Sequence, residues 1–480
     1  MKSVSLAELI TRLRTPVQTG SVSLPGMEVQ VHRCESLMES SQALKGLALD
    51  SRHVKPGFVF VAFQGEHCHG LDYADQAFQS GATVVLAESG SGTDSKWPLL
   101  EVADLRQALR HLATAEQRPV IGRARTVAVT GSVGKTTTCR LGSTLTASHW
   151  KTHSPRNSFN NFLGVPVTIL EAPEETEVLW LEMGTNEPGE IGGLASIGQP
   201  EIAVVTAVGA THLEKLGSVE GVFREKFSLF EEQGIRRAIA PVRFQTEEMP
   251  LPCWWTGPGG DVEVKSIPEM AGRFHFLHRP LGLEFEFEAP LTGVGSLRCL
   301  ESALAAAVAL EIPCEKLREA APLLSLPDLR QELHRIGDVE LVFDCYNASP
   351  PSVHGAVEDL AATSAARKLA VLGTMEELGV DEVEYHREVG RVCVRSGLDH
   401  VWCYGRGAAW LHEGVQSAGG SSSLLSSGEV GVEELESELR PGDRILFKAS
   451  RKESLEITAR QLKERLQGQS RTSQKGGGIA

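Results

Sequence analysis

The sequence contains no apolar run long enough to cross a bilayer, so we expect no membrane-spanning helix. Charged residues interrupt the N-terminal segment 1–8, where a signal peptide needs its apolar stretch, which argues against export. Basic residues are outnumbered, because 47 Lys and Arg face 62 Asp and Glu and give a formal net charge of −15. Nucleic-acid binding needs a basic surface, so this balance argues against DNA or RNA as a partner. We expect a cytoplasmic protein in which local positive charge meets any anionic substrate.

Cysteine is scarce, and its spacing lacks paired motifs. The nine cysteines are odd in number and scattered, and no two have the two-residue spacing of a zinc knuckle or a redox motif. We therefore expect free thiols in a reducing compartment. The hydrophobic content of 41% and the charged content of 23% are ordinary for a soluble globular enzyme. The length of 480 residues corresponds to about three domains at a common domain size of ~150 residues.

Residues 126–138 have the pattern of a phosphate-binding loop and read Thr-Val-Ala-Val-Thr-Gly-Ser-Val-Gly-Lys-Thr-Thr-Thr. Glycines let backbone N–H groups approach phosphate oxygens, Lys135 can neutralise their charge, and the Thr136 hydroxyl can bind Mg²⁺. The alternative is an ordinary strand-to-helix turn with a solvated lysine, and Val129 stands where the common pattern has glycine. The candidate nucleotide-binding residues of the loop are Gly131, Ser132, Val133, Gly134, Lys135, Thr136 and Thr137.

Two further polar side chains stand near the ends of predicted strands. Glu182 lies in the buried-looking strand 178–184, and His212 follows the strand 202–208. Open α/β sheets bind ligands at the carboxyl ends of their strands, so both are candidate Mg²⁺ ligands. The alternatives are a carboxylate paired with a lysine and a structural histidine. Asn160 and Asn161 precede a glycine and are either turn residues or substrate contacts.

The N-terminal region resembles the first domain of the Mur ligases, which act late in peptidoglycan precursor synthesis. The resemblance rests on Asp-Ser-Arg at 50–52, Pro-Gly at 56–57, Phe-Val-Ala-Phe-x-Gly at 60–65 and His-Gly-Leu-Asp-Tyr at 69–73. In this family the domain holds the UDP end of the substrate, which implies substrate binding by Ser51 and Arg52. Without the family, the same segments are ordinary small α/β elements with a turn.

The central region resembles the MurF branch of this family, the UDP-N-acetylmuramoyl-tripeptide:D-alanyl-D-alanine ligases. The resemblance lies in Glu-Met-Gly-Thr-Asn-Glu-Pro-Gly-Glu-Ile at 182–191 and His-Leu-Glu-Lys-Leu-Gly-Ser-Val-Glu-Gly at 212–221. It implies that Glu182 and His212 place magnesium. It also implies carbamylation of Lys226, which would turn a cation into an anion able to support a second metal ion. Taken alone, Lys226 is a solvated helix lysine paired with acidic neighbours.

The C-terminal region contains Asp-Cys-Tyr-Asn-Ala-Ser-Pro at 344–350, which resembles the MurF motif Asp-Ser/Thr-Tyr-Asn-Ala-Asn-Pro. The Asp of that motif approaches the ATP ribose, which implies ATP binding by Asp344 and Asn347. Arg330 matches an arginine that reaches the ATP phosphates on domain closure. The alternatives are a helix cap for Asp344 and a surface ion pair for Arg330.

Alternating strand-like and helix-like segments predict an α/β fold, and the resemblance implies three domains. We expect a small UDP-substrate domain, a central mononucleotide-binding domain of the P-loop ATPase type, a Rossmann-like domain and a disordered tail, over residues 1–118, 119–324, 325–466 and 467–480. The Gly/Ser-rich segment 414–431 is predicted to be a flexible loop.

The resemblance implies an ATP-dependent ligase that joins D-alanyl-D-alanine to UDP-MurNAc-tripeptide through an acyl phosphate. ATP and one or two Mg²⁺ ions are the implied cofactors, and a monomer is expected. The implied catalytic residues are Lys135, Glu182, His212, Lys226 and Arg330. The implied metal ligands are Thr136, Glu182, His212 and carbamylated Lys226.

Five positions depart from the MurF pattern, which puts base recognition and substrate contacts in doubt more than phosphate chemistry. They are Ala207, Ser228, Cys299, Ser302 and Thr374. Two alternatives therefore stand beside the ligase. One is a non-catalytic or regulatory nucleotide-binding paralogue, and the other is a Mur-family ligase with a different amino acid substrate.

Overall fold

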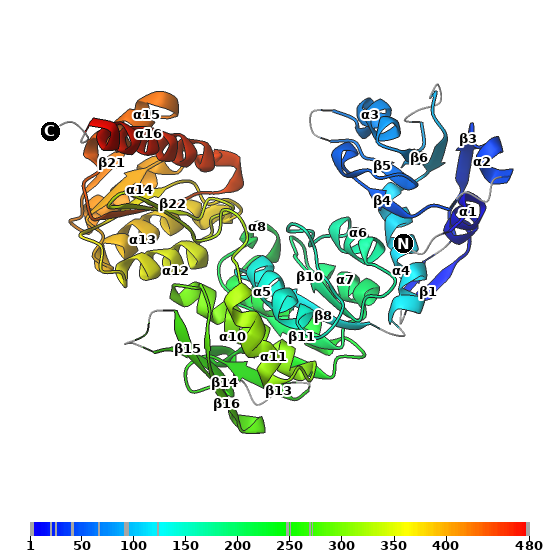
Figure 1. The fold of residues 1–480 in the computed structure, drawn as a ribbon, viewed down its shortest axis with the longest axis horizontal. Helices are drawn as coiled ribbons and strands as arrows, with labels where there is room; N and C mark the ends of the chain where they lie inside the picture. Colours follow the sequence, from blue (N-terminus) through cyan, green and yellow to red (C-terminus); the bar gives the residue numbers. More distant parts are fainter. Residues whose placement is uncertain are drawn as a thin grey trace.

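The computed structural model describes residues 4–19, 22–24, 26–39, 43–65, 68–90, 96–121, 124–245, 249, 251–267, 270 and 272–476. Figure 1 shows three α/β domains, with the N-terminal and C-terminal domains above the central one and on opposite sides of it. The predicted three-domain α/β architecture is confirmed, because each domain is built around its own multi-stranded sheet. None of the described helices combines the length and the apolar character needed to span a membrane.

The N-terminal domain contains a five-stranded sheet with strand order β3-β7-β6-β5-β4. In that order the strands span Val29–His32, Leu99–Val102, Ala82–Glu88, Phe58–Ala62 and Gly46–Ala48. Within this sheet, only the pair β3–β7 is antiparallel. Parallel strands are usually covered on both faces, and β6 is accordingly buried without interruption from Ala82 to Ala87. The remaining elements are α1 (Leu6–Arg14), β1 (Val17–Thr19), β2 (Val22–Leu24), α2 (Glu35–Glu39), η1 (Ser51–His53), η2 (Gly70–Tyr73) and α3 (Ala74–Gln79).

The central domain contains a nine-stranded sheet with strand order β16-β15-β14-β13-β12-β11-β8-β10-β9. In that order the strands span Leu283–Glu288, Arg273–His278, Val262–Ser266, Cys253–Thr256, Arg237–Pro241, Ile202–Val205, Arg125–Thr130, Val178–Glu182 and Thr152–His153. The pairs from β9 to β14 are parallel, and β15 and β16 extend the sheet as an antiparallel hairpin. The carboxyl ends of β8, β10 and β11 therefore meet at one edge.

Helices cover both faces of this sheet. Val127 and Val129 of β8 pack into the core shared with α5 (Lys135–Ala147) and α10 (Val294–Ala309). Ala128, which points to the opposite face, packs into the core shared with α6 (Gly164–Glu171) and α7 (Glu190–Gly198). The remaining α-helices of this domain are α8 (Leu213–Leu216), α9 (Val219–Phe227) and α11 (Cys314–Ala320).

Helix α4, which spans Leu105–Ile121, joins the first two domains. It packs on α1 of the N-terminal domain and on α6 and α7 of the central domain. The predicted boundary between residues 118 and 119 therefore falls inside a helix, and the exact domain limits stay a prediction.

The C-terminal domain contains a six-stranded sheet with strand order β17-β18-β22-β19-β20-β21. In that order the strands span Glu332–Ile336, Val339–Phe343, Asp443–Lys448, Arg367–Leu372, His400–Cys403 and Ser422–Leu424. All pairs except β17–β18 are parallel. One face packs on α12 (Pro350–Ala361), α13 (Glu382–Arg395) and α14 (Ala408–Ser417), and the other on α15 (Gly428–Glu438) and α16 (Leu455–Gly476). This is the Rossmann-like arrangement that the sequence predicted.

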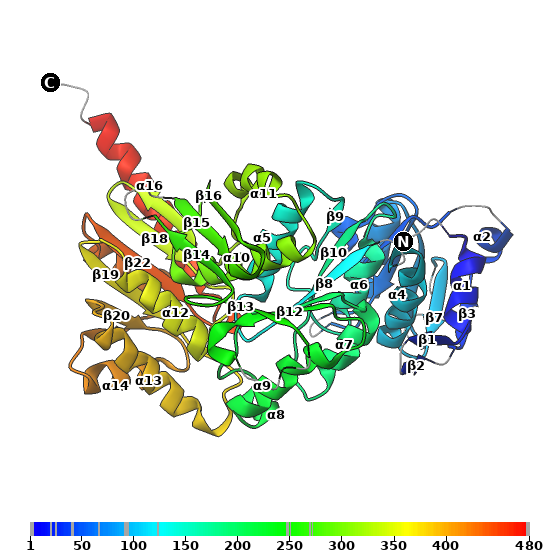
Figure 2. The same cartoon turned by 90° about the horizontal axis from the view of Figure 1, so that it is seen from below.

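Two local predictions for this domain are wrong. The segment 414–431, predicted as a flexible loop, contains the end of α14, the edge strand β21 and the start of α15, because pairing with β20 orders its serines. Residues 467–476, predicted as disordered, continue α16, which extends beyond the body of the domain in Figure 2. Residues 477–480 of the predicted tail lie outside the described residues.

Candidate active site

The phosphate loop lies between β8 and α5, at the carboxyl end of the central sheet. Gly131 and Gly134 have φ values of 147° and 89°, which residues with a Cβ rarely adopt. A Cβ on Gly131 would lie 2.1 Å from the Thr206 hydroxyl, and one on Gly134 would lie 2.9 Å from the Cys299 sulfur. The Lys135 ammonium folds back over the loop and donates to the Gly131 carbonyl at 2.7 Å, and burial lowers its pKa. Conformation and space thus both require the two glycines.

Glu182 ends β10, and the chain after β11 leads to His212, so the strand of the phosphate loop lies between them in the sheet. The Glu182 side chain is buried, and its Oε1 accepts a hydrogen bond from Asn160 Nδ2 at 2.8 Å. Its Oε2 is buried without a partner among the described residues. Asn161 has a different task, because its Oδ1 accepts from the backbone N–H groups of residues 163 and 164 and fixes the start of α6.

His212 connects the central domain to the C-terminal domain. Its backbone has a left-handed φ of 55°, and its Nδ1 lies 2.5 Å from Oε2 of Glu377, which comes from the loop after β19. The backbone N–H of Leu213 donates to the Glu377 carbonyl at 3.0 Å. The close His212 ring lowers the pKa of the Glu377 carboxyl. The predicted strand before His212 ends early, at Val205, so a longer loop carries the histidine.

Lys226 is fully buried on α9, which contradicts its reading as a solvated helix lysine. Its Nζ has no hydrogen-bond partner among the described residues. Burial, and secondarily the charge of Lys135, lowers its pKa to about 7. The carboxylate of Glu225 accepts instead from the backbone N–H groups of Gly189 and Ile191, at 2.7 and 2.9 Å. Within the described part of the chain, Lys226 is therefore a buried amine whose hydrogen-bonding capacity is unused.

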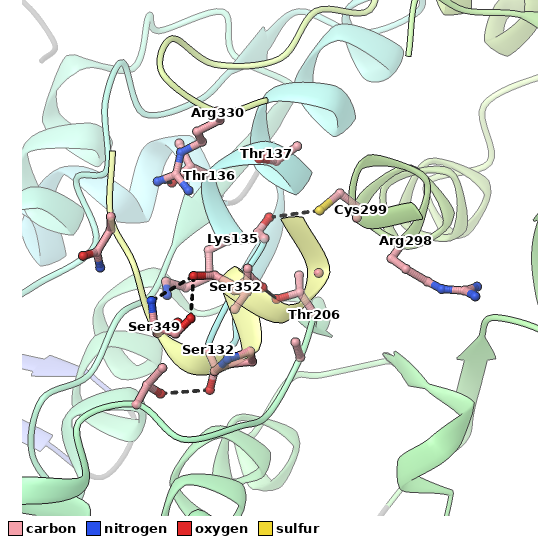
Figure 3. Close-up of a pocket in the computed structure, with 18 of the residues that line it drawn as sticks. Ser132, Lys135, Thr136, Thr137, Thr206, Arg298, Cys299, Arg330, Ser349 and Ser352 are labelled. Atoms are coloured by element: carbon pink, nitrogen blue, oxygen red, sulfur yellow. Dashed lines mark hydrogen bonds between the residues drawn. The ribbon is translucent and has the colours of Figure 1, made fainter. Parts of the chain in front are cut away.

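Arg330 crosses from the C-terminal domain to the phosphate loop (Figure 3). Its Nη2 donates to the Thr136 hydroxyl at 3.0 Å and approaches the Ser158 hydroxyl at 3.4 Å. Thr136 and Ser158 also share a hydrogen bond of 2.9 Å. The guanidinium carbon lies 4.3 Å from the centre of the Tyr346 ring. The structure therefore brings the predicted arginine to the predicted loop.

Asp344 directly follows β18, at the carboxyl end of this strand of the C-terminal sheet. Its Oδ2 accepts from Lys448 Nζ at 2.7 Å and from Gln331 Nε2 at 3.1 Å. The Lys448 ammonium also donates to the Asn347 carbonyl at 3.1 Å. Because Lys448 is only 3% exposed, this contact is a buried ion pair and not the helix cap proposed as an alternative.

A cleft of about 1000 Å³ separates the central and C-terminal domains. Its lining combines nearly all the predicted nucleotide and metal residues, namely Ser132, Val133, Gly134, Lys135, Thr136, Thr137, Asn160, Asn161, Glu182, His212, Arg330, Asp344 and Asn347. Gly131 of the phosphate loop and Lys226 of α9 are not among the lining residues. Lys135, Arg330 and Lys448 bring positive charge to this concave site, whose lining also contains carboxylates. The positive charge suits an anionic substrate.

Ser51 and Arg52 lie in the N-terminal domain and do not line this cleft. The Ser51 hydroxyl donates to Gln76 Oε1 at 2.7 Å. Arg52 is exposed and pairs with Asp50 at 2.6 Å, which lowers the pKa of that carboxyl to about 2. These two residues are thus placed apart from the phosphate loop.

The five departures from the MurF pattern all have defined contacts, and the Ser228 hydroxyl donates to the Glu225 carbonyl at 2.6 Å. The Ala207 carbonyl accepts from the phosphate-loop backbone at 2.8 Å, and the Cys299 thiol lies 3.7 Å from the Gly134 carbonyl oxygen. Ser302 is buried and donates to a carbonyl of its own helix at 3.2 Å. Thr374 is buried and accepts from the Gly407 backbone at 2.9 Å. Ser302 and Thr374 do not line the cleft, so they act through packing and not through direct nucleotide contact.

The predicted magnesium ligands fit a metal only in part. Among the described residues, no three His, Cys, Asp or Glu side chains are grouped as a metal site. Glu182 nevertheless offers the unpaired, buried Oε2, and Lys226 offers the unpaired, buried Nζ. These orphaned groups are the features of the site that a cation and a carbamate would satisfy.

Three residues of the site were not predicted as site residues from the sequence. Tyr346 stands within the motif quoted at 344–350, Lys448 ends β22, and Glu377 lies in the loop after β19. A lysine at the end of a buried strand is a usable signal, because buried charges are paired. The contact of Glu377 with the central domain has no sequence signal.

Three family models match the chain. "Mur ligase family, catalytic domain" matches residues 43–117, "Mur ligase middle domain" residues 129–248, and "Mur ligase, glutamate ligase domain" residues 330–451. A curated relative, UDP-N-acetylmuramoyl-tripeptide--D-alanyl-D-alanine ligase of Bacillus subtilis, is 30% identical over 431 residues, which cover 88% of this chain and 93% of the relative.

Two solved structures have a similar fold. MurF from Acinetobacter baumannii aligns with a TM-score of 0.76 at 27% identity and covers 88% of this chain and 94% of its own. MurF from Thermotoga maritima, solved in complex with ADP, aligns with a TM-score of 0.74 at 27% identity and covers 89% of this chain and 99% of its own.

Proposed function

Because this chain belongs to the Mur ligase family, we propose that it joins D-alanyl-D-alanine to UDP-N-acetylmuramoyl-tripeptide in an ATP-dependent reaction of peptidoglycan synthesis. The observation that carries the proposal is the two-domain cleft, in which Arg330 of the C-terminal domain reaches Thr136 of the phosphate loop. A site assembled from two domains suits a reaction that activates one substrate and then admits a second.

The chemistry proceeds in two steps. The terminal carboxylate of the tripeptide attacks the γ-phosphate of ATP, which forms an acyl phosphate and releases ADP. The amine of D-alanyl-D-alanine then attacks the acyl carbon, releases phosphate and loses a proton as the amide forms. Lys135 and Arg330 supply positive charge where negative charge spreads over the transferring phosphoryl group. Closure of the cleft around the substrates would keep water from the acyl phosphate.

Asp344 and Asn347 are the proposed contacts to the ATP ribose. Lys448 and Gln331 engage only Oδ2 of Asp344, and Oδ1 accepts no hydrogen bond within the described part of the chain. A ribose hydroxyl can donate to that free oxygen.

Magnesium is proposed to bind Glu182, whose Oε2 is buried and has no hydrogen-bond partner among the described residues, with Thr136 and His212 as further ligands. When bound, one or two ions would neutralise phosphate charge. Lys226 fits a carbamate, because its orphaned amine has a pKa of about 7 and roughly half of it is neutral near that pH. The neutral nitrogen would bond to the carbon of CO₂ and release one proton, which replaces an unpaired buried cation with an anion.

The N-terminal domain supplies the proposed UDP-substrate site. Arg52 is exposed and, within the described ranges, its side chain pairs only with Asp50 of its own turn, so its guanidinium is accessible to a diphosphate. Ser51 is buried beside it and positions the turn through Gln76. Asn160 and Asn161, at the cleft, are proposed to contact the peptide end. We also propose a cytoplasmic location, since all nine cysteines are free thiols.

Two alternatives stand against this proposal. A non-catalytic paralogue would bind nucleotide and release no phosphate, and a Mur-family ligase of another specificity would need a different amine substrate. Purified protein is incubated with ATP, Mg²⁺, UDP-MurNAc-tripeptide and D-alanyl-D-alanine, and phosphate release is measured with each component omitted in turn.

The ligase requires that release depend on all four components and that the product gain the mass of the dipeptide. Retained ATP binding without substrate-dependent release would favour the paralogue. Release with a different amino acid in place of D-alanyl-D-alanine would favour the other ligase. A Lys135→Met variant is the matched control, because it keeps side-chain length and removes the charge over the loop.

A further inference from the structure

We propose that Tyr346 is the positioning residue that presents Arg330 to the phosphate loop, and that Lys448 holds the Tyr346 turn in place for this purpose. The inference rests on the proposed function in one respect, because it takes Arg330 as a contact to the terminal phosphate of ATP.

Arg330 stands on a backbone segment that is unfavourable by itself. Its two neighbours, Leu329 and Gln331, have left-handed φ values of 56° and 53°. Residues other than glycine rarely adopt this region, and two of them flanking one side chain need external support. The segment therefore keeps its shape only because other groups hold it.

That support comes from the turn after β18. The backbone N–H of Tyr346 donates to the Leu329 carbonyl at 3.3 Å, and the side chain of Gln331 donates to Asp344 at 3.1 Å. The guanidinium of Arg330 stacks on the Tyr346 ring, with 4.3 Å between its carbon and the ring centre. Two hydrogen bonds thus fix the backbone on either side of Arg330, and the ring fixes its charged end.

Lys448 holds the turn after β18 from the neighbouring strand β22. It ends β22, which pairs with β18, and its ammonium is almost completely buried. The ammonium donates to the Asp344 carboxylate at 2.7 Å and to the Asn347 carbonyl at 3.1 Å. These two acceptors bracket Tyr346, and a buried charge holds its partners strongly because the unpaired state is costly.

The contacts of Arg330 fix the direction of its guanidinium and leave its positive charge unneutralised. No carboxylate within the described residues lies in ion-pair contact with its guanidinium, whose side-chain partners are the hydroxyls of Thr136 and Ser158. An aromatic face holds a cation without supplying a formal negative charge. Its full charge therefore remains available to an anion above the phosphate loop.

The structure thus separates two tasks. Arg330 carries the charge, and Tyr346 decides where the charge points. Without the ring, the guanidinium keeps its charge but samples more orientations, so its contact with the terminal phosphate weakens. Binding of the rest of the nucleotide does not depend on this orientation.

The test compares ADP with a non-hydrolysable ATP analogue, AMPPNP, by calorimetric titration of the full chain with Mg²⁺. The variants are Tyr346→Leu, Tyr346→Phe, Arg330→Met and the double variant Arg330→Met/Tyr346→Leu. Tyr385→Leu is the matched control, since Tyr385 lies in the same domain and does not line the cleft.

We expect Tyr346→Leu to weaken AMPPNP about tenfold and to leave ADP within about twofold, as loss of a partly buried cation–π contact predicts. Tyr346→Phe keeps the aromatic face and retains wild-type discrimination. The double variant matches Arg330→Met alone, because the ring acts only through the arginine. Lys448→Met should weaken AMPPNP as Tyr346→Leu does and should also weaken ADP, because Lys448 holds the proposed ribose contacts Asp344 and Asn347.

Equal weakening of ADP and AMPPNP by Tyr346→Leu would overturn the inference, because Tyr346 would then contact the base or ribose or serve only folding. Additive losses in the double variant would overturn it as well. If Lys448→Met does not fold, the tyrosine variants still decide. Wild-type protein that binds neither nucleotide would overturn the proposed function together with this inference, whereas unchanged discrimination in Tyr346→Leu would overturn the inference alone.

Discussion

Asp359 offers a prediction in which two opposing effects are compared at the domain interface. It lies on α12, and its carboxylate accepts from the backbone N–H groups of Val294 and Gly295, at 2.5 and 3.4 Å, at the start of α10. Figure 2 shows these two helices side by side across the two domains. A helix N-terminus favours the charged carboxylate, whereas burial disfavours it. Burial wins, and the pKa of Asp359 rises from 3.8 to about 6.

The magnitude follows from that change. Each tenfold change in the proton equilibrium corresponds to 1.36 kcal/mol, so the charged form weakens folding by about 3 kcal/mol at neutral pH. Asp359→Asn removes the charge and keeps one acceptor oxygen, and the weaker hydrogen bond is worth about 1 kcal/mol. We therefore expect the variant to be about 2 kcal/mol more stable than the wild type at pH 7.5.

The pH dependence gives the sign. The pKa of Asp359 is higher in the folded state than in the unfolded state, so the folded state binds more protons between pH 4 and 6. The stabilisation that the protonated Asp359 gives to the folded state is therefore lost as pH rises through 6. The advantage of Asp359→Asn should therefore shrink by about 2 kcal/mol between pH 7.5 and 4.5.

Urea unfolding of wild type, Asp359→Asn and Glu358→Gln at both pH values measures this difference. Glu358 is the exposed neighbour on the same helix and should change stability by less than about 0.5 kcal/mol. A destabilised Asp359→Asn at pH 7.5, or an advantage that does not change with pH, would refute the reasoning. In either case the helix terminus and its hydrogen bonds would outweigh burial.

Three further predictions concern the site. Lys226→Ala should lose phosphate release, and a short carboxylic acid in the assay should partly restore it; unchanged activity in the variant would contradict the carbamate. Gly131→Ala should abolish nucleotide binding, measured by titration, and should destabilise the fold by roughly 3 kcal/mol, because the added Cβ would lie 2.1 Å from a side-chain oxygen. Gly355→Ala is the control and should not destabilise the fold, because no atom lies within 4 Å of its added Cβ. Glu377→Gln should raise the KM for Mg²⁺ roughly tenfold, because Glu377 orients His212; an unchanged KM would show that their contact serves only domain docking.

The phosphate loop was predictable because its determinants are local. A strand, a glycine-rich turn and a lysine lie within 13 consecutive residues, and each has a conformational or electrostatic meaning by itself. Glu182 was predictable by a general rule, since the carboxyl ends of parallel strands converge. The helix and strand errors at 414–431 and 467–476 arose because composition was read without the tertiary partners of those segments.

Contacts between domains were not predictable from spacing. Glu377 reaches His212 and Arg330 reaches Thr136 only because the C-terminal domain docks over the central sheet. Lys448 lies 104 residues from its partner Asp344, and their strands are neighbours only in the folded sheet. The burial of Lys226 is equally tertiary, because the charged residues that precede it, Arg224 and Glu225, indicate a solvated helix face.

The sequence by itself determined which chemical groups this protein has and which family it resembles, because a phosphate loop and strand-end ligands are set by short-range pattern. The tertiary structure alone decided which of those groups are paired and which are left unpaired. Among the residues that the structure describes, Lys226 Nζ and one oxygen of Glu182 are buried without hydrogen-bond partners, whereas Arg330 is held by an aromatic ring and keeps its charge. The physical reason is that desolvation and pairing depend on neighbours brought together by folding, and these two effects set the charge of a side chain in the site.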